Sequence, residues 1–273
     1  MQALRGLGME DNCPVVDKGI DSNGFVITNI SIANVPQEFQ CVLEESVKAL
    51  QAILGLNLHS IYLYGSVGRG TAIFGKSDLD LSVIMNNDLS ESEKVGLTGL
   101  EEDICNHHEC ISKLEFDIGT YHEAMVKNDF EWQFWLRHMC VCVWGEDLRE
   151  QIQPFKPSLN VGLEMNKDIY RRLSNPRNKL SNTNFSAEGK SIAKKLLRTH
   201  YALLSEKDSS FYESLSDIAA CIENYEPSLK RQLEAAYEMA MGDVESIESV
   251  HELIEDYGDV VVEKFTRSGG ITT

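Results

Sequence analysis

Two aspartates separated by one residue give the sequence its clearest chemical signal. Asp78 and Asp80 lie in the run Asp-Leu-Asp-Leu, whose alternation of polar and apolar residues predicts a β-strand. Side chains alternate between the two faces of a strand, so both carboxylates project from one face and converge on the same space. Carboxylate oxygens are preferred ligands of hard cations. The pair therefore predicts a site for one or two ions such as Mg²⁺.

A glycine turn precedes this pair along the chain. The β-rich residues 59–64 end abruptly at Gly65-Ser66, and residues 67–77 separate this turn from Asp78. Glycine lets a backbone approach a phosphate closely, and the N–H groups that open a helix can bind an anion. Taken together, the turn and the two aspartates predict a site for a nucleoside triphosphate with Mg²⁺.

A further pair of carboxylates follows on a third predicted strand. Residues 113–118, Lys-Leu-Glu-Phe-Asp-Ile, alternate in polarity, which places Glu115 and Asp117 on one face. From the residues alone, either carboxylate could be the third acid of the site.

The elements that must position these residues fall into two halves. A helix is predicted over 36–54 from the spacing of its apolar residues, followed by strands at 59–64, 79–84 and 113–118 and a helix near 90–107, so the first half is α/β. Two prolines in residues 153–158 suit a linker. Beyond it, helices are predicted over 186–205, 209–224, 226–241 and 243–265. We therefore expect an α/β domain over 1–155 and an all-α domain over 156–273.

Composition limits the partners. The 273 residues include 25 basic and 43 acidic ones, a net charge of −18. This charge repels the phosphate backbone of nucleic acids and attracts cations. We therefore expect small-molecule partners, with neither nucleic acid nor membrane among them.

Cysteine usage and hydropathy indicate the compartment. The seven cysteines are odd in number and scattered, so we expect no disulfide framework, as in a reducing compartment. They are Cys13, Cys41, Cys105, Cys110, Cys140, Cys142 and Cys221. Residues 1–11 contain no continuous apolar segment typical of a secretory signal, and no apolar run approaches the roughly 20 residues of a bilayer span. We place the protein in the cytoplasm.

The order of these motifs resembles that of the nucleotidyltransferases of the DNA polymerase beta superfamily. Within it, the chain is most similar to bacterial streptomycin/spectinomycin adenylyltransferases, through Leu114-Glu115 on the third strand and Trp-Gly-Glu-Asp-Leu at 144–148. The resemblance implies a mixed sheet with flanking helices, a helical C-terminal domain, Mg²⁺ as cofactor and ATP as substrate.

The resemblance also assigns roles to individual residues. It implies that Asp78 and Asp80 hold Mg²⁺ on the triphosphate and that Glu115 is the general base, with Asp117 as a further metal ligand or a hydrogen-bonding acid nearby. Nucleotide binding falls to Gly65, Ser66, Ser77, Lys194 and Arg198.

The helix predicted near 186–205 carries a basic stripe. Lys190, Lys194 and Arg198 recur every four residues, which from periodicity alone fits a solvated face. The resemblance implies that Arg198 binds the triphosphate, and we expect its side chain to reach across from the helical domain to the α/β domain. The related enzymes carry a lysine further along the chain that has no clear counterpart in this sequence. Phe211 falls near the expected position, and Lys207 is the nearest displaced candidate.

An aromatic run lies in a helix that we expect to end at Trp144. Such a run is more typical of core than of a ligand platform, and it consists of Phe130, Trp132, Phe134 and Trp135.

The favoured function is transfer of AMP from ATP to a hydroxyl of a small cationic acceptor of the aminoglycoside type, and hence antibiotic resistance. Two alternatives are a toxin–antitoxin type nucleotidyltransferase acting on protein or tRNA, and a catalytically silent nucleotide-sensing or interaction module.

Overall fold

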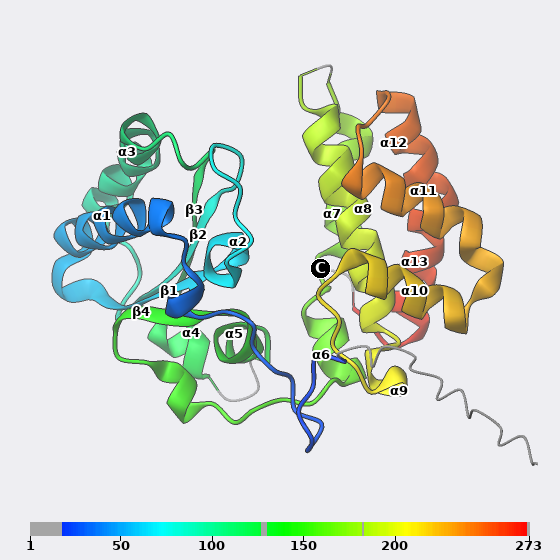
Figure 1. Cartoon of the computed structure of the whole chain (residues 1–273), viewed down its shortest axis with the longest axis horizontal. Helices are drawn as coiled ribbons and strands as arrows, with labels where there is room; N and C mark the ends of the chain where they lie inside the picture. The colour runs from blue at the N-terminus through cyan, green and yellow to red at the C-terminus, as the bar shows by residue number, and fades with distance from the viewer. Residues whose placement is uncertain (1–17, 127–129, 182, 272–273) are drawn as a thin grey trace, which may run out of the picture.

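The computed structural model describes residues 18–126, 130–181 and 183–271. Cys13 and residues 1–11 lie outside the described residues. The described part contains an α/β lobe built on a mixed sheet and a second, helical lobe (Figure 1). This is the fold class that the sequence and the resemblance predict.

The sheet has four strands in the order β3-β2-β1-β4. β1 (Leu58–Tyr64) pairs antiparallel with β2 (Leu79–Met85) and with β4 (Val141–Gly145), whereas β2 and β3 (Leu114–Thr120) run parallel. The three predicted strands, at 59–64, 79–84 and 113–118, are therefore confirmed. The helix expected to end at Trp144 is wrong at that end, because the β-branched residues of Val141-Cys-Val-Trp form strand β4 on the edge of β1.

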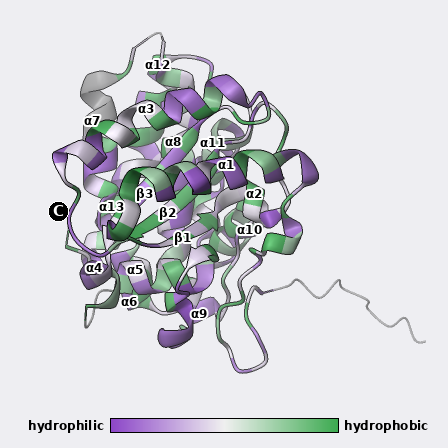
Figure 2. Cartoon of the chain, turned by 90° about the vertical axis from the view of Figure 1, so that its left-hand side faces the viewer, coloured by the Kyte–Doolittle hydropathy of each residue, from purple (hydrophilic) through white to green (hydrophobic). Residues whose placement is uncertain are grey.

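Two helices cover one face of the sheet. α1 (Gln37–Leu54) and α3 (Glu91–His107) pack there, and the buried side chains of α1, among them Phe39, Val42 and Leu50, join the strands in one apolar core. Figure 2 shows hydrophobic and hydrophilic stretches alternating along α1, as its amphipathic pattern requires. The predicted helix over 36–54 is confirmed, with Pro36 as its N-cap.

The opposite face carries shorter elements. α4 (Tyr121–Met125), α5 (Phe130–Phe134) and a π-helical turn (Trp135–Met139) cover its inner part, where Ile84, Leu136 and Cys140 are buried. These elements leave the ends of β2 and β3 near Asp80 and Glu115 less covered, and both acids are only partly buried. The candidate site lies at this open corner.

The helical lobe is built around α8 (Phe185–Ala202). Its other helices are α6 (Leu159–Glu164), α7 (Ile169–Lys179), α9 (Ser205–Asp208), α10 (Leu215–Tyr225), α11 (Lys230–Met241), α12 (Ile247–Leu253) and α13 (Asp259–Arg267), with a π-helical turn over Ile254–Gly258. Short 3₁₀ turns occupy Ile32–Asn34, Gly55–Asn57, Leu148–Gln151 and Pro227–Leu229.

The helical predictions need three corrections. Ser209 adopts a left-handed backbone with φ of 51°, so 209–214 is a loop and the helix begins at Leu215. The last predicted helix begins at 247 instead of 243, because the Ser246 hydroxyl caps it. α6 and α7 were not predicted.

The two lobes share contacts through the segment before α1. The Phe211 amide donates a hydrogen bond to the Lys18 carbonyl, and the Ser31 amide donates to the Gly68 carbonyl. Val26, Phe134 and Val161 form a small buried cluster between the lobes. The domain boundary near residue 155 stays a prediction. Of the helices described, none has the length and apolar character needed to cross a membrane.

Candidate active site

Three carboxylates converge at the open corner of the sheet. Asp80 and Glu115 are register partners on the parallel strands β2 and β3, and Asp78 lies just before β2. One ligand oxygen from each of the three lies within 4.8 Å of the others, and all three residues are half-buried. We call Asp78, Asp80 and Glu115 the acidic triad. Parallel pairing explains its geometry, because partners on adjacent strands project side by side from the same face.

Asp78 is positioned by a loop contact. The Ser112 hydroxyl donates to Asp78 Oδ1 at 2.6 Å, and the Ser112 amide donates to the Ser77 carbonyl at 3.0 Å. These bonds tie the start of β2 to the start of β3. The Ser77 hydroxyl accepts a hydrogen bond from the Ile73 amide at 2.8 Å, so it folds the loop that leads to Asp78.

The glycine turn lies against the triad. Gly65 has φ of +74° and opens α2 (Gly65–Arg69), and the Ser66 carbonyl accepts a hydrogen bond from the Thr71 amide at 3.0 Å. This backbone conformation is one that glycine adopts without strain. The turn thus lies beside the carboxylates that the sequence grouped with it.

The triad is electrostatically strained when no cation is present. Burial, followed by the charges of Glu115 and Asp78, raises the pKa of Asp80 to about 7, and the nearby Arg69 partly offsets this rise. Like charges held close together disfavour ionisation, and a bound cation reverses that effect. The donor set of three carboxylates fits a hard divalent ion such as Mg²⁺.

The two acids on β3 have different surroundings. Glu115 forms an ion pair with Lys113. Asp117 pairs in register with Ser82, is exposed, and accepts a hydrogen bond from the Tyr64 hydroxyl at 2.7 Å. The structure thus groups Glu115 with Asp78 and Asp80, whereas Asp117 lies two residues further along β3.

Comparison with known proteins agrees with this geometry. The family model "Nucleotidyltransferase domain" matches residues 43–137, which include the glycine turn, the acidic triad and Asp117. The chain contains a nucleotidyltransferase domain. It is therefore an enzyme of the nucleotidyltransferase class, as the resemblance predicted.

A solved structure shares the architecture of this nucleotidyltransferase. It is the spectinomycin adenyltransferase AAD(9) from Enterococcus faecialis with ATP and spectinomycin, at a TM-score of 0.52 and 13% identity, over 80% of this chain and 98% of that chain. At this identity the likeness concerns the fold. The chain matches none of the curated proteins.

The helical lobe of the nucleotidyltransferase directs an arginine toward the same corner. Arg198 on α8 has an exposed side chain. Desolvation by neighbouring protein, followed by the positive charge of Arg69, lowers the pKa of Arg198, and the negative charge of Glu213 raises it. Arg69 Nη1 lies 3.9 Å from Glu213 Oε2, a contact between the two lobes. Arg69, Arg198 and Glu213 therefore lie together. The charge of Arg69 also lowers the pKa of Asp80, so Arg69 is near the acidic triad as well.

Sequence reasoning missed Arg69. The available signal was its position at the end of the Gly-Ser turn helix, three residues after Ser66. Its proximity to Arg198 could not be read from the sequence, because it depends on how the two lobes meet.

The other basic residues have separate surroundings. Burial and the charges of Arg198 and Lys190 lower the pKa of Lys194. Lys190 lies 3.9 Å from Asp243, and Lys207 lies over the Tyr225 ring at 4.5 Å. Phe211 packs against Phe134 with ring centroids 5.4 Å apart. Arg198 is the member of the stripe that approaches Arg69.

The aromatic run packs against the core, as its pattern predicts: Phe134 belongs to one buried cluster, and Trp132 and Trp135 pack against another. Phe134 is buried, whereas Trp132 and Trp135 are partly exposed. Trp135 Nε1 donates to the Ser82 hydroxyl at 3.0 Å, which fixes this ring on the face of the sheet that carries the triad.

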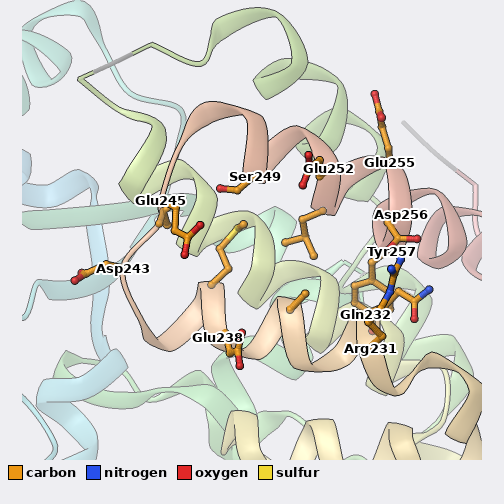
Figure 3. A pocket seen from close by; sticks show the side chains of 14 residues that line it. Arg231, Gln232, Glu238, Asp243, Glu245, Ser249, Glu252, Glu255, Asp256 and Tyr257 are labelled. Carbon is orange, nitrogen blue, oxygen red and sulfur yellow. Dashed lines mark hydrogen bonds and ion pairs between the residues drawn. The ribbon is translucent and has the colours of Figure 1, made fainter.

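A cavity of about 750 Å³ lies elsewhere, between α11 and α12 (Figure 3). Its lining includes acidic side chains such as Glu238, Glu245 and Glu252 and apolar ones such as Met239 and Leu253. The cavity contains none of the site residues predicted from the sequence.

Proposed function

We propose that this nucleotidyltransferase is an adenylyltransferase that transfers AMP from ATP to a hydroxyl of a small cationic acceptor of the aminoglycoside type, with release of pyrophosphate. The observation that carries the proposal is the convergence of Asp78, Asp80 and Glu115 beside the Gly65 turn. Adenylylation of an antibiotic hydroxyl would confer resistance, and we place the enzyme in the cytoplasm.

The acidic triad is suited to divalent cations. In this proposal Asp78 and Asp80 hold Mg²⁺, and Glu115 completes the acidic set from the neighbouring strand. Bound Mg²⁺ would supply charge stabilisation for the triphosphate and lower the pKa of a nearby hydroxyl.

The remaining groups bind and orient the nucleotide. Gly65 and Ser66 approach the triphosphate through the backbone, and Arg198 reaches it from the helical lobe, with Lys194 adding positive charge one turn away. Arginine suits this task because its fixed fork of donors matches phosphate oxygens. Arg69 places a second guanidinium nearby. Ser77 acts on the loop before Asp78 and need not touch the nucleotide.

Glu115 acts on the acceptor. Its carboxylate accepts the proton of the acceptor hydroxyl while that oxygen attacks the α-phosphorus of ATP in line. The new O–P bond forms as the bond to the β-phosphate oxygen breaks, and pyrophosphate leaves. Lys113 forms an ion pair with Glu115 and so lies beside the carboxylate that takes the proton.

The test uses the purified full-length protein, MgCl₂, ATP labelled on the α-phosphate, and a panel containing spectinomycin, streptomycin and kanamycin. We expect label on one panel member and unlabelled pyrophosphate in equal amount. A matched reaction with γ-labelled ATP should put label in pyrophosphate alone. Label on the protein itself, or on none of the panel, would contradict the proposed acceptor.

A further inference from the structure

Asp117 is an exposed carboxylate on the reactive face of the sheet. It lies two residues beyond Glu115 on β3, so the two side chains project from the same face at positions about 7 Å apart. Glu115 has Lys113 as its ion-pair partner. Over the part of the chain that the structure describes, Asp117 forms no ion pair with a lysine, arginine or histidine.

Tyr64 contacts Asp117 directly, and Trp135 packs against Tyr64. The Tyr64 hydroxyl donates to Asp117 Oδ2 at 2.7 Å, and the Tyr64 ring meets Trp135 edge to face with centroids 5.0 Å apart. Trp135 is anchored in turn to Ser82, the register partner of Asp117. Both rings are half-buried, so each keeps part of its surface open.

In the contact between Tyr64 and Asp117 the phenol is the donor and the carboxylate the acceptor. Burial, together with the nearby carboxylates, raises the pKa of Tyr64 well above its ordinary value, so the phenol stays protonated and acts as the donor. This bond engages one carboxylate oxygen, and Asp117 as a residue is exposed. An anionic group beside aromatic rings is the chemistry that binds ammonium and guanidinium ions.

We propose that Asp117, with Tyr64 bonded to it and Trp135 packed on Tyr64, binds a cationic group of the acceptor and so determines its specificity. The inference rests on the proposed function, because the acceptor must present a hydroxyl to Glu115 at the same time. An amino sugar or aminocyclitol carries both groups on one ring system and can engage the two carboxylates together. Asp117 is thereby given a different role from the metal ligand that the resemblance implied.

The experiment measures binding by the full-length protein in the presence of Mg²⁺ and α,β-methylene-ATP, which cannot transfer AMP. Spectinomycin, streptomycin and kanamycin are titrated by calorimetry into wild type, Asp117→Asn and Tyr64→Phe. Fully N-acetylated kanamycin is the probe that lacks the amines. Asp103→Asn, on the exposed surface of α3, is the matched control for loss of one negative charge.

We expect Asp117→Asn to weaken binding of at least one amine-bearing probe by about tenfold to hundredfold, the range for a charge-assisted hydrogen bond. Binding of N-acetylated kanamycin and of the nucleotide should not change. Tyr64→Phe should cost less, because the carboxylate remains, and Asp103→Asn should match wild type.

Equal affinity of wild type and Asp117→Asn for every probe, including the case in which neither binds, would overturn the inference. Weaker binding of Mg²⁺ and nucleotide by Asp117→Asn would instead make Asp117 a metal ligand. The AMP-transfer assay is scored separately. A wild type that binds cations through Asp117 but transfers no AMP would sink the proposed function and leave this subsite standing.

Discussion

A side chain at Gly65 would collide with the carboxylate of Asp80. A Cβ built on Gly65 would lie 1.9 Å from Asp80 Oδ2, and the residue has φ of +74°. The glycine of the turn therefore has two functions: it permits the left-handed backbone and leaves room for a carboxylate of the acidic triad. The turn and the aspartates are one packed unit, although residues 66–79 separate them in sequence.

Gly65→Ala should therefore disable the site. The new methyl group must displace Asp80, and a left-handed alanine costs about 1–2 kcal/mol. We expect a lower melting temperature and loss of Mg²⁺-dependent ATP binding, measured by thermal unfolding and calorimetry. Gly99→Ala is the control, since a Cβ there meets no atom within 4 Å and α3 should gain stability. Unchanged ATP affinity in Gly65→Ala would contradict the packed unit.

The raised pKa of Asp80 predicts how stability depends on pH. Between its ordinary value of 3.8 and about 7, the folded protein holds a proton on Asp80 that the unfolded chain has lost. This bound proton therefore stabilises the fold fully below pH 3.8. Its contribution falls between pH 3.8 and 7 and is gone above 7, a loss of up to about 4 kcal/mol. Urea unfolding of the metal-free protein at pH 5 to 8 measures this loss.

Asp80→Asn should flatten that pH dependence and abolish AMP transfer, because an amide replaces a metal-binding carboxylate. Asp103→Asn should keep the slope. Added Mg²⁺ should stabilise wild type more at pH 8 than at pH 6, since the ion competes with the proton. Equal stabilisation by Mg²⁺ at both pH values would argue against a metal site at Asp80.

Glu115→Gln separates proton transfer from nucleotide binding. The variant should bind MgATP nearly as well as wild type and lose about 10²-fold to 10⁴-fold in kcat, because proton acceptance is removed. Calorimetry gives the ATP Kd, and labelled AMP transfer gives kcat. If Glu115→Gln weakens MgATP binding as much as Asp80→Asn does, Glu115 is chiefly a metal ligand.

Strands β1, β2 and β3 and the pairing of acids on one face were within reach of the sequence because both follow from local rules. A β-rich run located β1, alternation located β2 and β3, and the two-residue period placed Asp78 with Asp80 and Glu115 with Asp117. The choice between Glu115 and Asp117 needed the pairing register, which no local pattern fixes.

Other features depended on contacts distant in sequence. β4 is a short edge strand that exists by pairing with β1, and it follows a helical run without a turn signal strong enough to separate them. The contact of Arg69 with Glu213 depends on the meeting of two lobes. The site at the sheet corner was thus predictable, and its completion from the helical lobe was only partly so.

Ser112 provides a test of how Asp78 is held. Ser112→Ala removes the 2.6 Å hydrogen bond to Asp78 Oδ1, so the carboxylate should lose its fixed orientation. We expect the Mg²⁺ concentration for half-maximal activity to rise about tenfold to hundredfold, in keeping with a hydrogen bond to a charged group, with kcat at saturating Mg²⁺ little changed. Ser112→Thr keeps a hydroxyl and should restore the wild-type requirement. A fall in kcat that excess Mg²⁺ does not correct would show a different role.

Arg198→Ala tests whether the helical lobe contributes to nucleotide binding. MgATP remains anionic and the α/β lobe concentrates negative charge at the triad, so a cation from α8 should be needed to hold the triphosphate. We expect the Kd for MgATP to rise about tenfold to hundredfold, with acceptor binding in the absence of nucleotide largely unchanged. Arg267→Ala, an exposed arginine at the end of α13, should bind MgATP like wild type. Wild-type MgATP affinity in Arg198→Ala would mean that the triphosphate is held by the α/β lobe alone, and the site would not extend between the lobes.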